Sequence, residues 1–352
     1  MTGLYNVKSC DTRPPLAALN HDLAAIYPPL AHCAGGSGRL GGVTFSIPLR
    51  PAASMFRNAY LLLLLTTLFW GGNAVAGKLA VGHISPMLLT TLRWALAVAA
   101  VAAIGLPQLR RDWHVVKRNL PLLFLLGTAG FTMFNAAMYS ALTFTTAINV
   151  SIEQAGMPMF IFLANFLLYR MGVSPGQIVG FTLSLVGVAL TASHGDLTRL
   201  AELDVNFGDA LMLAAIVLYG GYTVALRYKP AIHWKSLMLV MCFAAFLSSI
   251  PFAAWEITTE RVTWPDTRGW MIVVYTAILP SIASQAFYMR GVELIGANRA
   301  GLFINLVPIF GTLLSILILG EAFHLYHAIA LVMVLGGIWL AEQSGRKRAA
   351  GS

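Results

Sequence analysis

The chain has 352 residues, of which 58% are hydrophobic and only 11% are charged, and its formal net charge is +9. An ordinary globular chain has about 25% charged residues, so a soluble protein is excluded because polar residues are too few to cover its surface. Glycine and proline follow no fixed period and there are only three cysteines, which excludes collagen-like and disulfide-framework proteins. The composition therefore predicts an all-α polytopic membrane protein.

Residues 1–54 differ from the rest of the chain because paired prolines and glycines interrupt them and no apolar run survives between these breakers. They lack the compact hydrophobic region of a signal peptide. Met55 leads directly into an apolar run and resembles a natural translation start. We expect 1–54 to be a tail that is disordered or dispensable.

From residue 60 onward the chain reads as apolar runs of about 20 residues, the length that spans a bilayer as a helix. Connections are short, so neighbouring helices should be antiparallel, and the loop over 194–207 is expected to be an external linker. No soluble domain is inserted. The ten predicted spans are 60–79, 86–106, 120–141, 145–169, 174–193, 208–227, 236–255, 269–290, 297–319 and 324–342.

The basic residues punctuate the apolar runs and form no continuous basic face, so nucleic acid is not an expected partner. With a cytoplasmic N-terminus, alternating loops place fifteen of the 23 Lys and Arg residues inside and four outside. This asymmetry predicts that both termini are cytoplasmic, because positively charged loops stay on that side. Residues 344–352 are then a basic cytoplasmic C-terminus.

The chain matches itself about 150 residues apart. The aromatic-Gly-Gly motif at Trp70 to Asn73 resembles that at Tyr219 to Tyr222, and Pro158 falls on Pro308. Five spans per copy is an odd number, so the second copy enters the membrane from the opposite side. We therefore predict two inverted five-helix repeats around a central cavity, a geometry typical of alternating-access transporters. The predicted repeats cover 55–193 and 208–343.

The pattern resembles the EamA-type branch of the drug/metabolite transporter superfamily over about 60–343. The resemblance rests on the ten spans, the W-G-G-N start at Trp70 to Asn73, Lys78, Pro86 with Arg93 seven residues later, and the Pro158/Pro308 pair. Within that branch the chain looks most like the YddG-type exporters of aromatic and other neutral amino acids. The resemblance implies a ten-helix basket in a bacterial inner membrane, with no cofactor, that exports small metabolites.

Two charged residues lie deep inside predicted spans. Arg93 is about seven residues into the second span and Glu153 about eight into the fourth, so both lie about 10–12 Å from the outer end at 1.5 Å per residue. Because a lone charge in the bilayer costs at least about 2.5–3.5 kcal/mol, we expect the two to pair. One interpretation is a substrate contact for Arg93 and a gate or proton site for Glu153; the other is a fixed salt bridge between spans.

Neutral polar and aromatic residues recur at helical spacing on four spans. Lipid offers such groups no partner, so they should face the bundle interior, either as substrate contacts or as hydrogen bonds that join helices. A lining of this kind suits a nearly neutral solute. The candidate substrate-binding residues are Trp70, Asn73, Arg93, Asn135, Tyr139, Glu153, Tyr219, Tyr222, Gln285 and Tyr288.

Pro158 and Pro308 each remove a backbone donor in mid-span. We interpret them as flexing points for gating, because they occupy matched positions in the two copies; a packing kink is the alternative. The small-residue series Gly176, Gly180 and Ser184 could serve a dimer, but packing within one chain is favoured. A monomer is expected, with a dimer left open.

The sequence contains no metal motif, and its eight histidines lie in the tail, loops or span ends. Neither a metal site nor an enzyme is therefore expected. The main hypothesis is an exporter of amino acids or similar metabolites. Because the only carboxylate well inside a span is expected to pair with Arg93, facilitated diffusion is favoured. The alternatives are a proton-coupled exchanger of drugs or nucleotide sugars and, from another class, an intramembrane enzyme or scaffold.

Overall fold

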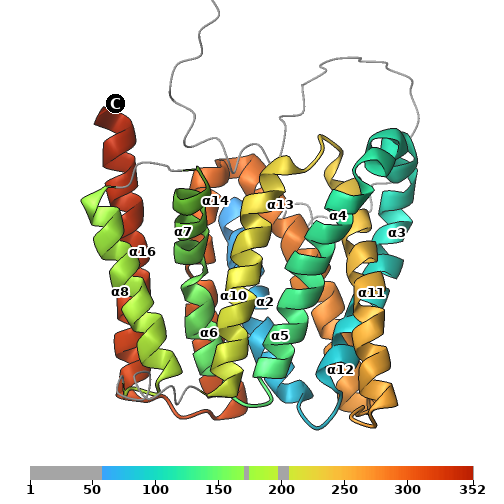
Figure 1. The fold of residues 1–352 in the computed structure, drawn as a ribbon, viewed down its shortest axis with the longest axis horizontal. Coiled ribbons are helices and arrows are strands. Elements are labelled where there is room, and N and C mark those ends of the chain that lie inside the picture. The colour runs from blue at the N-terminus through green and yellow to red at the C-terminus, as the bar shows by residue number, and fades with distance from the viewer. Residues whose placement is uncertain (1–57, 170–173, 197–205, 352) are drawn as a thin grey trace, which may run out of the picture.

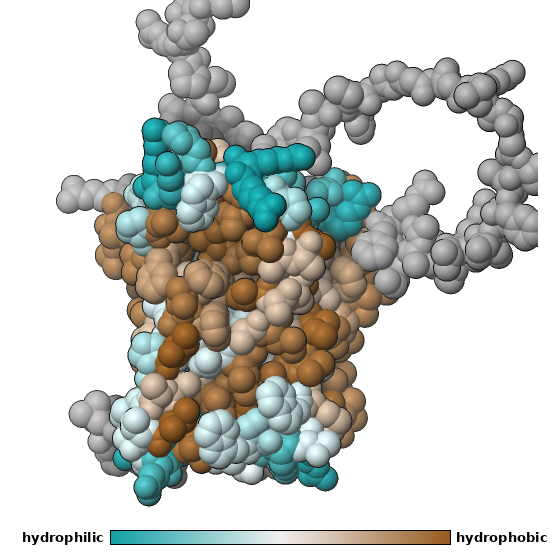
Figure 2. All heavy atoms as spheres, turned by 90° about the vertical axis from the view of Figure 1, so that its right-hand side faces the viewer, coloured by the Kyte–Doolittle hydropathy of each residue, from teal (hydrophilic) through white to brown (hydrophobic). Residues whose placement is uncertain are grey.

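The computed structural model describes residues 58–169, 174–196 and 206–351, so the predicted tail over 1–54 and most of the predicted linker lie outside the described part of the chain. All regular structure in the described part is helical. The helices stand side by side in one bundle (Figure 1), and a broad hydrophobic band separates two more hydrophilic ends (Figure 2). This surface is that of a membrane-embedded bundle. We call the end that carries the C-terminus the proximal side and the opposite end the distal side.

The first half of the chain forms five helical runs. They are α2 (Ala59–Ala80), α3 (Pro86–Arg118), a third run of α4 (Leu120–Gly127), the π-helical η3 (Thr128–Met133) and α5 (Phe134–Ala141), a fourth of α6 (Ala147–Ala155) and α7 (Met157–Tyr169), and α8 (Pro175–Ala192).

The second half is built in the same order. It has α10 (Phe207–Ala225) with the short η4 (Leu226–Tyr228), α11 (Trp234–Thr258), a third run of α12 (Thr267–Thr276), the π-helical η5 (Ala277–Ala283) and α13 (Ser284–Ile295), a fourth of α14 (Ala297–Ile304), α15 (Val307–Leu314) and the π-helical η6 (Ser315–Leu319), and α16 (Leu325–Gly351). A π-helical turn therefore interrupts the third run of each half.

Nine of these runs, within the described residues, are long and apolar enough to cross a membrane. The predicted span over 297–319 is the exception, because a turn divides it into α14 and a shorter apolar helix at Val307–Leu319. The helical multi-span architecture is thus confirmed. The count of ten spans and the inversion of the two repeats stay predictions.

The fourth run of each half is broken just before a proline. Gly156 separates α6 from α7, and a two-residue turn separates α14 from α15. Pro158 and Pro308 are each the second residue of the helix after the break. A proline is tolerated in a first helical turn because that N–H has no intrahelical acceptor. The mid-span kinks expected from the sequence are therefore restarts of the helix.

The predicted end of the second span at residue 106 is wrong. The helix α3 continues through Pro107 to Arg118, and Figure 1 shows its last turns turned away from the axis of its first half. The continuation packs because Val116 is fully buried against Val240 of α11. The proline and basic residues after residue 106 indicated a loop, but apolar packing against α11 keeps this segment helical.

The helices α3 and α11 cap each other at opposite ends of the bundle. On the proximal side the Asp112 Oδ2 accepts from the His233 backbone N–H at 3.1 Å and from the Ser236 hydroxyl at 2.6 Å. On the distal side the Glu256 carboxylate accepts from the Ser85 hydroxyl at 2.6 Å and from the backbone N–H groups of Met87 and Leu88 at 3.1 and 3.0 Å. These bonds satisfy helix N-termini that have no partner of their own inside the helix.

A second tie on the distal side joins the loop after α2 to α12. The Asp266 carboxylate accepts from the Gly269 N–H at 2.8 Å and lies 2.7 Å from the His83 Nδ1. The bond from Gly269, followed by that from His83, lowers the pKa of Asp266 below its usual value. Asp266 therefore stays ionised and keeps the α12 N-terminus capped at neutral pH.

The small residues of α8 pack within the chain, against α16. A side chain added at Gly180 would meet the Gly337 carbonyl and, at 2.9 Å, the Ala341 backbone nitrogen. The Ser184 hydroxyl donates to the Val334 carbonyl at 3.1 Å. The interpretation of Gly180 and Ser184 as packing residues within one chain is confirmed, so this face needs no second copy.

We expect Gly337→Ala to lower the stability of the protein and Gly336→Ala to leave it nearly unchanged. A methyl group at Gly337 would clash with the Ser184 hydroxyl and lie 2.9 Å from the Ser184 backbone nitrogen, whereas nothing lies within 4 Å at Gly336. Overpacking of this kind costs typically about 1–3 kcal/mol. The midpoints of thermal unfolding in detergent measure the difference, and equal midpoints for the two variants would contradict the packing of α8 on α16.

Candidate functional site

A buried polar cluster lies where α2, α3 and the third runs of both halves meet. The turns η3 and η5 interrupt the third runs just before or at the residues that enter the cluster, Asn135 on α5 and Ser281 in η5. Such π-helical turns occur frequently at functional sites because the extra residue re-aims the side chains after it. The matched turns therefore point to the centre of the bundle as the site.

Arg93 is the hub of this cluster and its side chain is 4% exposed. Its Nε donates to the Ser281 hydroxyl at 2.8 Å. Its Nη1 donates to the Asn73 Oδ1 at 3.2 Å, to the Asn135 Oδ1 at 2.6 Å and to the Tyr139 hydroxyl. All four acceptors are neutral, so the positive charge is hydrogen-bonded without being neutralised.

Further contacts fix the cluster. The Tyr139 hydroxyl donates to the Asn73 Oδ1 at 3.0 Å, and the Asn135 Nδ2 donates to the Phe131 carbonyl at 2.7 Å. The Arg93 guanidinium also lies 5.0 Å from the centre of the Trp94 ring, a cation–π geometry. The predicted residues Asn73, Arg93, Asn135 and Tyr139 are therefore brought together, and Ser281 and Trp94 join them.

The expected ion pair between Arg93 and Glu153 is wrong. Glu153 is fully buried, and neither of its carboxylate oxygens has a hydrogen-bond partner among the described residues. Arg93 is turned instead toward α5 and η5. The two residues share a depth in the bundle, but their side chains leave their helices in different directions.

The aromatic candidates form two groups around the cluster. The Trp70 indole donates to the Pro280 carbonyl at 3.2 Å, and its ring lies 5.6 Å from that of Tyr288. The Tyr219 ring lies 5.2 Å from the Tyr222 ring and 4.9 Å from that of Phe134. These rings line the bundle interior with large apolar faces.

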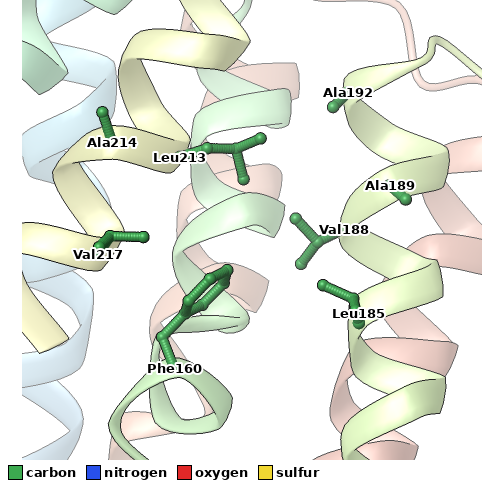
Figure 3. Close-up of a pocket in the computed structure, with 8 residues that line it drawn as sticks. All are labelled: Phe160, Leu185, Val188, Ala189, Ala192, Leu213, Ala214 and Val217. Atoms are coloured by element: carbon green, nitrogen blue, oxygen red, sulfur yellow. The ribbon is translucent and has the colours of Figure 1, made fainter. Parts of the chain in front are cut away.

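Gln285 is half-buried and donates no hydrogen bond to the Arg93 cluster. A crevice of about 340 Å³ lies elsewhere, between α7, α8 and α10 (Figure 3), and it is not the predicted central cavity. All eight residues that line it are apolar: Phe160, Leu185, Val188, Ala189, Ala192, Leu213, Ala214 and Val217. No group of His, Cys, Asp and Glu within the described ranges could hold a metal ion.

Sequence reasoning missed a second group of titratable residues near the distal ends of α8, α10 and α16. Asp209 is fully buried although it lies only two residues into its helix, and its Oδ2 is 3.3 Å from the His194 Nε2. His327 is 2% exposed and bonds to Asn149. An acidic residue at the start of an apolar run, together with histidines at neighbouring span ends, was the available signal.

The described helices and the buried Arg93 cluster define a polytopic membrane protein with a polar site inside its bundle. A sequence model of the EamA-like transporter family matches the chain twice, over residues 57–193 and 206–342. The chain therefore belongs to the EamA-like transporter family. It is a multi-pass membrane protein of a transporter family, and the resemblance to this branch seen in the sequence is confirmed.

Proteins similar in sequence occur in bacteria and archaea. The chain is 25% identical to the uncharacterized transporter YetK of Bacillus subtilis, over 80% of this chain and 86% of that protein. It is 27% identical to an uncharacterized transporter of Archaeoglobus fulgidus, over 81% and 98%. It is 24% identical to the uncharacterized inner membrane transporter YicL of Salmonella typhimurium, over 83% and 98%. All three are named as transporters.

A solved structure described as "Crystal structure of protein" shares the fold, with a TM-score of 0.56 at 22% identity. The match covers 82% of this chain and 98% of that one.

Proposed function

We propose that the protein exports amino acids or similar small, nearly neutral solutes across a bacterial inner membrane, with both termini in the cytoplasm. The Arg93 guanidinium carries the proposal. Its Nη2 makes no hydrogen bond to any described residue, whereas Nε and Nη1 are held by neutral groups. A positive charge that is positioned but not neutralised suits an incoming carboxylate, which the free Nη2 can bind through a charge-assisted hydrogen bond.

The surroundings of Arg93 favour a cargo with one carboxylate and an apolar body. The rings of Trp70 and Tyr288 and those of Tyr219 and Tyr222 offer stacking surfaces. A phosphate or nucleotide-sugar cargo would call for several converging cations, and no Lys or Arg among the described residues other than Arg93 bonds to this cluster. This arrangement supports an aromatic or other neutral amino acid over the nucleotide-sugar and drug alternatives.

The two halves are not in the same arrangement, which supports alternating access as the mechanism. On α2, a side chain added at Gly71 would lie 2.7 Å from the Gly311 backbone nitrogen of α15. At the equivalent Gly220 on α10, the nearest atom is 3.6 Å away, on Phe160 of α7. One half is packed tightly where the other is loose, as expected for a transporter that exchanges two related states. Pro158 and Pro308 mark the breaks at which the fourth runs would flex.

The test reconstitutes the purified protein in liposomes loaded with excess unlabelled amino acid. It then measures uptake of labelled Phe, Trp, Thr and Met from outside. We expect counterflow of at least one aromatic or neutral amino acid above that of empty liposomes. If none of the four amino acids is taken up, amino-acid transport is contradicted. Transport of another metabolite and a scaffold role would then be the remaining alternatives. A single chain is expected to suffice, because the small residues of α8 are occupied within the chain.

A further inference from the structure

A second buried polar cluster, distinct from the Arg93 cluster, lies toward the distal side of the bundle. We call it the distal cluster. Its members come from α6 and the residue pair before it, from the end of α8, from α10 and from α16. It comprises Thr145, Asn149, Glu153, His194, Asp209 and His327.

A chain of hydrogen bonds runs through the distal cluster toward Asp209. The His324 backbone N–H donates to the His327 Nδ1 at 3.0 Å, so the proton of a neutral His327 ring is on Nε2, which lies 3.1 Å from the Asn149 Oδ1. The Asn149 Nδ2 donates to the Thr145 hydroxyl at 3.2 Å, and that hydroxyl donates to the Asp209 carboxylate. Each hydrogen bond in this chain is thus donated in the direction of the Asp209 carboxylate.

Glu153 is the member without a role in this network. It lies one helical turn beyond Asn149 on α6, is 0% exposed, and bonds through neither oxygen to any described residue. Asn149, one turn earlier on the same helix, is joined to Asp209 through the Thr145 hydroxyl. An ionised carboxylate buried without a partner costs at least about 2.5–3.5 kcal/mol, and a second carboxylate nearby adds repulsion. Glu153 therefore carries a proton in this state.

The distal cluster has an opening to solvent through His194. This residue comes after α8 in a left-handed conformation, with φ of 52°, and its side chain is 33% exposed. Its Nε2 lies 3.3 Å from the Asp209 Oδ2, which accepts no hydrogen bond. A proton from the distal solution can therefore reach the buried Asp209 carboxyl through one imidazole, the usual proton shuttle near neutral pH.

We propose that Glu153 and Asp209 form a proton-binding pair, loaded from the distal side through His194, and that solute export is exchanged for proton entry. The step moves one proton from the distal solution to the pair and releases it on the proximal side, while one solute moves the other way. This inference rests on the proposed transport function. It replaces facilitated diffusion, which the sequence favours only if Glu153 pairs with Arg93.

The helix α6 connects the two clusters. Glu153 lies one turn after Asn149 of the distal cluster, and the next residue, Gln154, donates from Nε2 to the Met138 Sδ at 3.8 Å. The same sulfur accepts from the Asn73 Nδ2, at 3.9 Å, within the Arg93 cluster. Because α6 ends at the break before Pro158, a change in the charge of Glu153 acts on the mobile end of the fourth run and on the solute site together.

Other titratable groups near this end of α6 are already engaged. Lys78 donates to the Leu142 and Thr145 carbonyls at 2.9 and 2.7 Å, and Glu321 accepts from the first backbone N–H groups of α6. Other titratable groups on or next to the helices packed against α6 include Tyr219, Tyr222, His324 and Tyr326. None of these is an unpartnered carboxyl, so Glu153 and Asp209 are the groups whose proton is exchanged.

The first test needs no solute. Infrared difference spectra of the full-length protein in liposomes, recorded between acid and alkaline pH, should contain the carbonyl band of a buried protonated carboxyl. We expect that band to vanish in Glu153→Gln and to shift in Asp209→Asn. The control is Glu293→Gln, which removes an exposed carboxylate paired with Arg290 and should leave the band unchanged. A band that persists in Glu153→Gln overturns the proton site.

The second test measures coupling with the labelled amino acid that the wild-type protein carries in counterflow. With an imposed gradient of one pH unit, one-for-one exchange allows accumulation up to about tenfold. We expect the wild type and Glu293→Gln to accumulate the amino acid when the gradient is imposed. In Glu153→Gln, uptake with the gradient should equal uptake without it. Counterflow without any response to the gradient overturns the coupling and leaves transport intact. Absence of counterflow overturns the proposed transport function and the coupling that rests on it. The infrared spectra then still show whether Glu153 binds a proton.

Discussion

Arg93→Ala is expected to reduce the initial rate of amino-acid transport by roughly 100-fold. Hydrogen bonds to charged groups contribute about 1.5–3 kcal/mol each, so loss of the charge-assisted bond between the Arg93 Nη2 and a solute carboxylate removes up to about 3 kcal/mol. Each 1.4 kcal/mol corresponds to a tenfold change. The rate is measured as uptake of labelled amino acid into proteoliposomes at a solute concentration below saturation.

Two further variants separate charge from geometry. Arg93→Lys keeps the charge but replaces the two nitrogens that bond to Ser281 and Asn135 by a single ammonium nitrogen, so we expect a rate between those of Arg93→Ala and the wild type. Arg290→Ala removes an exposed cation whose partner is Glu293, and it should transport normally. A wild-type rate in Arg93→Ala would show that Arg93 does not contact the solute. Its role would then be structural, to join helices by hydrogen bonds.

Helical spacing correctly predicted which neutral residues would share the interior. Asn73, Asn135 and Tyr139 came from separate stripes on two spans, and all three bond to Arg93. Spacing succeeds here because a polar group that faces lipid has no partner, so polar stripes must turn inward. The third span was also predicted with the bounds that the structure shows, 120–141.

The pairing of Arg93 with Glu153 failed for a geometric reason. Counting residues from the end of a span gives the height of a side chain in the membrane, but it does not say toward which neighbouring helix that side chain points. Arg93 points to η5 and α5, and the buried Glu153 carboxylate makes no hydrogen bond to any described residue. That direction depends on how the helices pack, which the spacing within one helix does not contain.

Spacing alone says less about the eighth predicted span. Ser281, Gln285 and Tyr288 are spaced to share one face of an α-helix, and of the three only Ser281 bonds to Arg93. Ser281 lies within the π-helical η5, where its hydroxyl donates to the Thr276 carbonyl five residues earlier at 2.8 Å. A π-helical turn adds a residue to the hydrogen-bonded ring and rotates the rest of the helix about its axis, so a count based on the α-helical period does not place Gln285 relative to Ser281.

We expect Glu321→Ala to open the distal side of the bundle. Glu321 comes directly after Gly320, whose φ of 67° turns the chain sharply after η6. Its carboxylate accepts from the Ala147 and Ile148 backbone N–H groups of α6 at 2.8 and 2.9 Å. It thus holds the distal ends of the two fourth runs together. Two such bonds contribute about 3 kcal/mol or more, enough to shift a two-state equilibrium by about 100-fold.

The opening is measured as the rate at which a membrane-impermeant maleimide labels Ser151→Cys, in a protein whose own cysteines are replaced by alanine. Ser151 is 2% exposed and packs against Gly311 of α15, so a thiol there is protected while the distal side is closed. Glu321→Gln keeps an oxygen acceptor and should label at an intermediate rate, and Glu260→Gln, at an exposed carboxylate on the same side, should not change labelling. Equal labelling in Glu321→Ala and its parent would mean that contacts such as Ser151 against Gly311, and not the carboxylate cap, keep the distal side closed.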